Sequence, residues 1–134
     1  MLEIQGQRIM LDGSCVGFYR HHKTPSVPIT NVMGLFDSDC QAAIKSLTKT
    51  RRVIDYVWIS DIAVRPKWRR QGIGSRILEK VGRAPGTLLA CAPGSGVEGG
   101  MRMKHRNRLA FYRSLGFTIV EGDKHDYAFK FTPP

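Results

Sequence analysis

The sequence has no long apolar run, and its cysteines and histidines are sparse. None of its 134 residues falls in an uninterrupted apolar stretch near the ~18 that a membrane-spanning helix needs. The N-terminus lacks a basic segment followed by an apolar one, so no secretory signal is expected, and we expect a cytoplasmic protein. Three cysteines without CxxC spacing argue against a disulfide framework and predict reduced thiols. Four histidines without an HExxH pattern give no reason to expect a metal.

Linkers, repeats and low-complexity tracts are also missing. No stretch rich in proline, glycine and serine separates the chain into two halves. With 42% hydrophobic residues, the chain is long enough to bury roughly two-thirds of its unfolded surface in one core. We therefore expect residues 1–134 to form a single domain.

Acidic residues are absent from two segments, 65–76 and 102–113. Each segment holds five lysines or arginines, and together these ten account for the net charge of +10. Such local excess of cations usually faces an anionic ligand, such as phosphate groups or nucleic acid. The plainer interpretation is a basic surface that only contacts solvent.

The apolar pattern predicts an α/β (α+β) fold in which helices flank a mixed central sheet. Asp12-Gly13 lies between two β-rich runs and predicts a hairpin. Residues 21–30 contain two prolines without periodicity and predict a loop. The remaining expected elements are helices at 38–50, from about 72, and 104–115, and strands at 53–64, 87–92, 117–122 and 127–132. The expected order is therefore two strands, helix, strand, helix, strand, helix and two strands.

A basic, glycine-containing turn lies between the long expected strand and the next helix. Its sequence is Arg69-Arg70-Gln71-Gly72-Ile73-Gly74. Glycines let backbone N–H groups approach a ligand closely, and the first turn of a helix offers unpaired donors and positive potential. An anion is therefore expected here, although glycines in such turns are often only steric punctuation. The spacing fits neither a Walker loop nor a GxGxxG dinucleotide loop.

Two segments resemble motifs of the GCN5-related N-acetyltransferase (GNAT) superfamily. Residues 59–66 (ISDIAVRP), followed by Arg69-x-x-Gly72-x-Gly74, look like its acetyl-CoA motif. Residues 111–117 (FYRSLGF) are similar to its FYxxLGF segment. The resemblance covers residues 53 to about 132 and implies an acetyl-CoA-dependent N-acetyltransferase.

The resemblance also implies the roles of single residues. The pantetheine arm of acetyl-CoA would pair with the strand at Ile62, Ala63 and Val64. Tyr112 would protonate or hydrogen-bond the departing thiolate; otherwise it is a packed core tyrosine. The pyrophosphate would bind the turn and the helix start, formed by Arg69, Arg70, Gln71, Gly72, Ile73, Gly74 and Ser75.

The sequence departs from the family pattern in two places. Where the family often has Asn and Ala, seven and four residues before the tyrosine, this chain has His105 and Arg108. The displaced Asn107 is a candidate cofactor ligand, and His105 is its substitute. The N-terminal part is reduced or rearranged, because the strand and two helices that usually precede the first hairpin are missing. A homodimer in which a second copy completes the acceptor site is compatible with this departure.

Acyl transfer to an amine needs a group that accepts a proton. Asp61 is our candidate for a base or acceptor-orienting group, and an ion pair with a neighbouring arginine is its alternative role. Ser60, Asp55 and Glu98 are rivals, and strand alternation predicts Ser60 and Asp61 on opposite faces. Cys91 allows an acyl-enzyme scheme, but its apolar surroundings favour an inert buried thiol.

The sequence thus predicts a transferase that moves acetyl from acetyl-CoA directly to a primary amine in a ternary complex. The amine belongs to a small molecule or a protein. Alternatives are an acyltransferase acting on nucleic acid or aminoacyl-tRNA, through the basic segment 102–113, and a non-catalytic module that binds coenzyme A or nucleic acid.

Overall fold

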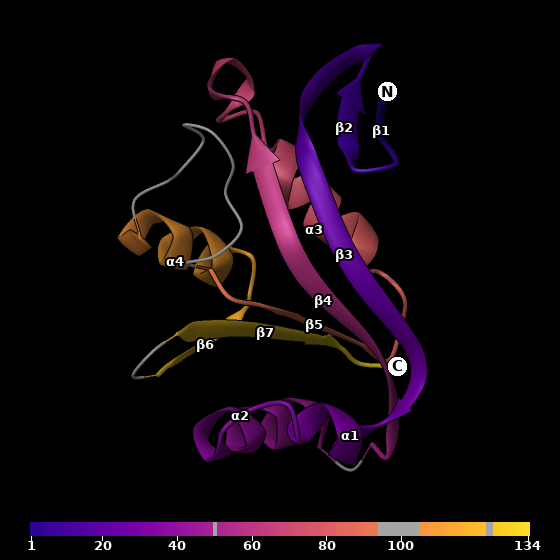
Figure 1. The fold of residues 1–134 in the computed structure, drawn as a ribbon, viewed down its shortest axis with the longest axis vertical. Helices are drawn as coiled ribbons and strands as arrows, with labels where there is room; N and C mark the ends of the chain where they lie inside the picture. The colour runs from indigo at the N-terminus through magenta and orange to yellow at the C-terminus, as the bar shows by residue number, and fades with distance from the viewer. Residues whose placement is uncertain (50, 94–104, 123–124) are drawn as a thin grey trace.

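A seven-stranded sheet runs through the protein in the order β1-β2-β3-β4-β5-β7-β6. The structure, a computed structural model, describes residues 1–49, 51–93, 105–122 and 125–134. Among these described residues, β4 and β5 pair in parallel, and the other neighbouring strands pair antiparallel (Figure 1). This mixed sheet with flanking helices confirms the predicted fold class.

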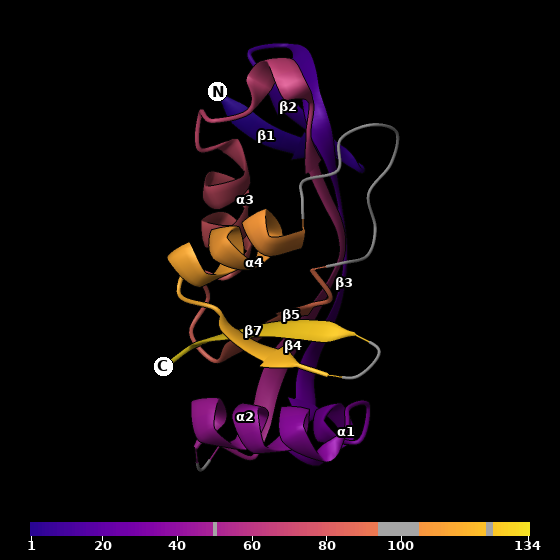
Figure 2. The same ribbon diagram turned by 90° about the vertical axis from the view of Figure 1, so that its left-hand side faces the viewer.

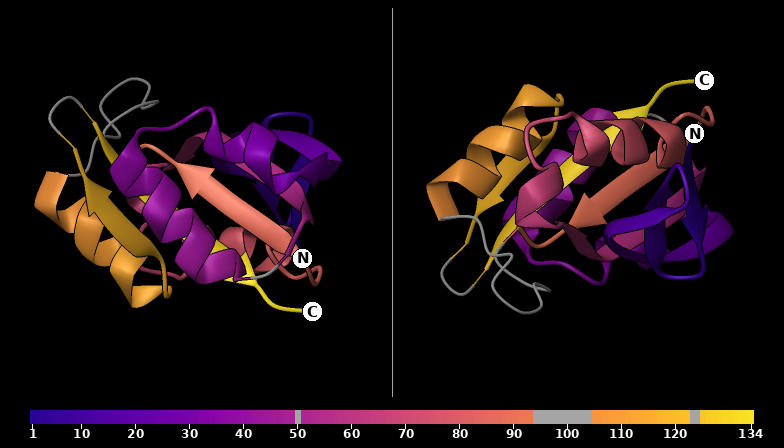
Figure 3. Two further views of the ribbon diagram at one scale, coloured as in Figure 1. Left: turned by 90° about the horizontal axis from the view of Figure 1, so that it is seen from below. Right: turned by 90° about the horizontal axis from the view of Figure 1, so that it is seen from above.

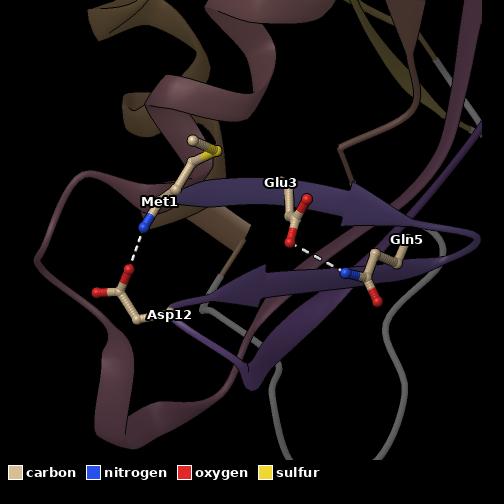
Figure 4. Close-up of polar contacts among 4 residues, drawn as sticks. All are labelled: Met1, Glu3, Gln5 and Asp12. Atoms are coloured by element: carbon tan, nitrogen blue, oxygen red, sulfur yellow. Dashed lines mark hydrogen bonds and ion pairs between the residues drawn. The ribbon is translucent and has the colours of Figure 1, made fainter.

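The N-terminal region forms three strands, β1 (Leu2–Gln5), β2 (Arg8–Leu11) and β3 (Ser14–Pro28). The predicted hairpin at Asp12-Gly13 is confirmed: both residues have positive φ, 48° and 84°, as a two-residue turn between twisted strands requires. A second hairpin at Gly6-Gln7, which the sequence reading missed, adds β1. In Figure 4 the Met1 ammonium pairs with Asp12, and the Gln5 amide donates to Glu3 at 3.0 Å.

The loop predicted for residues 21–30 is wrong, because β3 continues to Pro28 along β4. The ladder shifts register between Thr24 and Val27, and Pro25 lies in this irregular stretch, where a missing N–H is tolerated. Ser26, at φ 49°, donates its N–H to Asp55 Oδ1 at 2.9 Å.

Two helices, α1 (Ile29–Met33) and α2 (Ser38–Thr48), follow β3. The helix near 38–50 is confirmed, while α1 was not predicted. Asp37 caps α2 by accepting the Cys40 N–H at 3.0 Å.

The second half of the chain follows the predicted order. It consists of β4 (Val53–Val64), a short 3-10 turn at Pro66–Trp68, α3 (Ile73–Val81), β5 (Thr87–Cys91), α4 (His105–Ser114), β6 (Thr118–Glu121) and β7 (Asp126–Thr132). Gly116 follows α4 with φ 85°, the left-handed conformation that often ends a helix.

Two apolar cores lie on opposite faces of the sheet. One joins α3 and α4 to residues such as Tyr19, Ile59 and Tyr112; the other joins α1 and α2 to residues such as Ile54 and Phe129. Figure 2 shows α3 and α4 on one side of β3 and β4, with α1 and α2 at one end. Seen end-on in Figure 3, β5 runs roughly along the helix α2, whereas β7 crosses β3 and β4 at a steep angle in Figure 1, as expected of a strongly twisted sheet. No helix in the described ranges is long and apolar enough to cross a membrane.

Candidate functional site

The parallel strands β4 and β5 diverge about halfway along β4. Their last pair is Ile59 with Cys91, where β5 ends, whereas β4 runs on to Val64 paired only with β3. At the same point β4 carries a bulge: Arg20 pairs with Asp61 and His21 with Ile59, which leaves Ser60 unmatched. We call the unpaired side of residues 60–64 the free edge of β4.

The hydrogen-bond pattern identifies the groups at the free edge. Arg65 donates its N–H to Val16 O at 2.8 Å. In an antiparallel pair the backbone groups of alternate residues face the partner strand, so Arg65 and Ala63 direct their N–H and C=O groups toward β3. Ile62 and Val64 therefore direct their N–H and C=O groups away from β3, to the free edge. Ala63 faces β3 with its backbone instead.

The turn after β4 has the geometry of an anion site. Arg70 and Gly72 have φ of 65° and 71°, and Gly72 caps α3 without any side-chain hydrogen bond. The first intrahelical bond is from Arg76 N to Gly72 O, at 3.0 Å. The N–H groups of residues 73–75 consequently have no acceptor within the helix, and they lie at its positive end. We call residues 69–75 the anion turn.

The side chains of the anion turn divide into anchors and exposed groups. Arg69 Nε donates to Val64 O at 3.0 Å and ties the turn to the free edge, while its Nη2 is buried without a hydrogen-bond partner. Ile73 is a core residue, 2% exposed. Gly74 allows close packing, since a Cβ there would lie 3.2 Å from the Phe111 ring. Arg70 and Gln71 are exposed, and Ser75 is half-buried.

A pocket occupies the point where the strands diverge. It holds about 280 Å³, part of it open to solvent. Its walls come from β4 at the bulge, from the end of β5, and from α4; they are Ile59, Ser60, Asp61, Ile62, Cys91, Ala92, Pro93, Arg108 and Tyr112. We call this cavity the splay pocket. The free edge thus links the anion turn to the splay pocket.

Tyr112 is both a core residue and a pocket residue. Its ring packs edge-on against Phe111 and Phe117, each at 5.2 Å between centroids, and it is 5% exposed. Burial raises the pKa of its hydroxyl well above the usual value. A hydrogen bond joins this hydroxyl to the Cys91 thiol, and it lowers the pKa of the thiol and raises that of the phenol.

The Cys91 thiol is 2% exposed. Burial raises its pKa to about 12, although the hydrogen bond with Tyr112 lowers it. A thiol that stays protonated at neutral pH is a poor nucleophile. The geometry thus argues against an acyl-enzyme scheme at Cys91.

Asp61 lies in the pocket wall and pairs with Arg20 of β3, directly across the ladder. Its side chain is 16% exposed and that of Arg20 is 50% exposed. Ser60 also lines the pocket, so the expectation that Ser60 and Asp61 lie on opposite faces is wrong: the bulge interrupts the alternation. Arg20 was missed by the sequence reading, because nothing in the sequence reveals which β3 residue faces Asp61.

The other predicted site residues lie elsewhere. Asp55 lies near the other end of β4, where it pairs with Thr87 of β5, and its carboxylate accepts the hydrogen bond from the Ser26 N–H of β3. Asn107 and His105 belong to the α4 backbone, but their side chains lie outside the described part of the protein, as do Glu98 and the side chains of residues 102–107 in the basic segment. Of that segment, Arg108 reaches the splay pocket.

Solved structures with the same fold include several N-acetyltransferases. Bacillus subtilis YlbP in complex with coenzyme A matches with a TM-score of 0.55, 16% identity, and coverage of 92% of this chain and 65% of that one. AtaT complexed with acetyl-methionyl-tRNAfMet matches at 0.51 and 16% identity, over 90% of this chain and 65% of that one. Arabidopsis thaliana Naa50 with the bisubstrate analogue CoA-Ac-MVNAL matches at 0.50 and 14% identity, over 91% and 68% of the two chains. The chain thus spans slightly less than two-thirds of the first two relatives.

Sequence comparison is more specific than fold comparison at these identities. No curated protein sequence matches the chain. A family model described as the Acetyltransferase (GNAT) domain, however, matches residues 34–119. This match includes β4, the anion turn, the splay pocket residues and α4, which are the elements that build the site. The chain therefore belongs to the GNAT acetyltransferase domain family.

Proposed function

We propose that this protein is an N-acetyltransferase that moves an acetyl group from acetyl-CoA to a primary amine by direct transfer in a ternary complex. The observation that carries the proposal is the free edge of β4, which runs from the anion turn to the splay pocket. A long ligand with phosphates at one end, amides in the middle and a reactive group at the other matches this order of features. Coenzyme A is the ligand named for the YlbP structure.

The residues present fit such a ligand. The N–H groups of residues 73–75 and the positive end of α3 would hold the pyrophosphate, with Arg70 adding charge. The buried Arg69 Nη2 lacks a partner and is a further donor beside the turn. Ile62 and Val64 offer strand-type hydrogen bonds to the amides, as in β-augmentation. Acetyl-CoA, when bound, supplies a thioester-activated acetyl group.

Tyr112 would assist the departing thiolate. Because burial raises the pKa of its hydroxyl, the group keeps its proton at neutral pH and would donate a hydrogen bond to the thiolate. Its position in the wall of the splay pocket gives it access to a reacting group there.

Asp61 would receive or orient the acceptor amine, with Ser60 as the rival group in the same wall. Asp61 already has a cationic partner in Arg20. An ammonium entering the pocket would take the place of the guanidinium at the carboxylate. Arg20, half-exposed, can swing into solvent when that exchange occurs.

Calorimetric titration with acetyl-CoA, beside dephospho-CoA and ATP, tests the proposal. We expect saturable binding that favours acetyl-CoA. Gly72→Ala should weaken it strongly, because φ of 71° is strained for alanine although the space is open. Gly86→Ala, which carries the same strain at φ 79° in the turn before β5, should bind normally. Absence of binding at high micromolar acetyl-CoA would overturn the proposal.

A second candidate is transfer to an amine carried by nucleic acid. The face of β2, β3 and β4 turned away from α3 and α4 has no described helix over its outer half (Figure 2). It presents Arg8, opposite Phe18, with Arg65 stacked 5.6 Å above the Phe18 ring centre, and Arg20 two residues farther on. We call these residues the open face. Basic groups around an aromatic ring suit a single-stranded nucleic acid, and AtaT is a neighbour bound to a tRNA.

A further inference from the structure

Four aromatic rings meet on the face of the sheet that packs against α1 and α2. They belong to Phe36, Trp58, Tyr127 and Phe129, and we call them the aromatic cluster. Phe36 meets Tyr127 and Phe129 nearly at right angles, at 5.3 and 5.2 Å between ring centres. Trp58 lies 6.3 Å from Phe36 and 6.4 Å from Tyr127, measured in the same way. Phe129 is fully buried, whereas the other three are only half-buried.

Strand register places the aromatic cluster beside the splay pocket. Trp58 pairs with Ala90, one residue before β4 and β5 diverge. Tyr127 comes just before the β7 residue that pairs with Cys91, the last residue of β5. Tyr127 is therefore level with Ala92, which is part of the pocket wall. Both rings thus border the point at which the pocket opens between the strands.

The strand β4 connects the aromatic cluster to the candidate acceptor group. Ile62 packs against the core that contains α3 and α4, so its neighbour Asp61 points to the opposite face, which carries the aromatic cluster. Trp58 and Asp61 are three residues apart, and a strand rises about 3.3 Å per residue, so their Cα atoms are at most about 10 Å apart. An amine at the Asp61 carboxylate can therefore lay a side chain of benzyl size over the Trp58 ring.

The position of Phe36 is fixed by the connection between α1 and α2. Its N–H donates to Met33 O at 3.1 Å, and its C=O accepts the side-chain amide of Gln41 at 2.8 Å. The next residue, Asp37, caps α2. A ring whose backbone is held on both sides forms a preformed apolar wall, and little ordering is needed when a ligand binds against it.

We propose that the aromatic cluster selects the acceptor, which is a primary amine whose neighbouring carbon carries a large apolar group. The amine lies at Asp61, and the apolar group packs against Phe36, Trp58 and Tyr127. Binding sites commonly combine an apolar wall with a few polar groups that fix the orientation of the ligand. Moving an apolar side chain from water onto these rings favours such an acceptor over one that has only hydrogen in that place. The inference deepens the proposed function and rests on it for the transfer step.

Amino-acid amides are suitable probes, because they share an α-amine and differ in the side chain beside it. For phenylalaninamide, kcat/KM should exceed that for glycinamide by at least about tenfold. Tyr127→Leu should lower kcat/KM for phenylalaninamide several-fold more than for glycinamide. Phe131→Leu is the matched control, since it removes a half-buried ring from the same strand and core, but opposite Leu88, away from the pocket. That variant should keep the preference. Equal kcat/KM values for the two amides in the wild type would overturn the inference.

Binding of the apolar group can also be followed without turnover, by NMR of the Trp58 indole N–H. The chain has two tryptophans, and Trp68→Phe leaves a single indole signal, which belongs to Trp58. Titration with phenylalaninamide should shift this signal saturably, and glycinamide should shift it far less. A Trp58 signal that phenylalaninamide leaves unchanged would overturn the inference. Failure of acetyl-CoA to bind, with the Trp58 shift present, would overturn only the proposed function.

Discussion

Gly17 and Gly74 each pack closely against a neighbouring group that an added Cβ would crowd. The two neighbouring groups differ in how far they can move. A Cβ on Gly17 would lie 2.1 Å from the backbone oxygen of Ala63, in the strand that carries the free edge. A Cβ on Gly74 would lie 3.2 Å from the Phe111 ring, which is a side chain. The first neighbour is fixed by the ladder, while the second can rotate.

We therefore expect Gly17→Ala to destabilise the protein by about 1–3 kcal/mol, the usual range for overpacking, and to weaken acetyl-CoA binding because β4 must move. Gly74→Ala should lose less stability and keep most of its binding. Urea denaturation and calorimetry on both variants measure these effects. Equal losses would show that the approach of β3 to Ala63 has no special importance.

At the scale of elements, α2 depends on the Asp37 cap. The hydrogen bond from the Cys40 backbone lowers the pKa of the Asp37 carboxyl below its usual 3.8. A carboxyl with a lowered pKa in the folded state stabilises the fold above its unfolded pKa, and this contribution disappears as the pH falls through the folded value. The relevant window therefore begins near pH 4 and extends downward.

We expect the melting temperature of Asp37→Asn to lie below that of the wild type at pH 7. The difference between the two melting temperatures should be smaller at pH 3. Asparagine still caps the helix but does not titrate, so its melting temperature should change less with pH. Asp39→Asn, in the first turn of the same helix, is the control for loss of a carboxylate. Thermal melts at the two pH values measure the difference. A difference in melting temperature that is the same at both pH values would mean that the stabilising effect of the Asp37 cap does not depend on its charge.

Elements with strong periodicity or turn chemistry could be predicted from the sequence. The Asp12-Gly13 hairpin, α2 and the run from β4 to α4 depend on local signals such as φ-permissive turns and apolar stripes. The continuation of β3 over residues 21–28 could not be predicted. Its irregular ladder is held by the Asp55 carboxylate, a contact between residues far apart in the sequence.

At the scale of the whole molecule, the site also has one part that local sequence signals reveal and another that forms only through contacts between distant residues. The anion turn is one contiguous segment, so its glycines and arginines identify it in the sequence. The splay pocket combines β4, the end of β5 and α4, and depends on the bulge at Ser60. Arg20 comes to Asp61 only through the register of β3 on β4. No local pattern in the sequence encodes that register.

The open face should make binding of a nucleic acid depend on salt. We expect Arg8→Glu with Arg65→Glu to weaken tRNA binding and to reduce the slope of log K against log salt by about 1.4–1.8, since each of the two phosphate contacts contributes about 0.7–0.9. Lys45→Glu with Lys80→Glu changes the net charge equally, on exposed positions of α2 and α3. Fluorescence anisotropy between about 50 and 200 mM salt compares the two pairs. Equal effects would assign the binding to net charge alone, and the acceptor would then be sought among small amines and peptides.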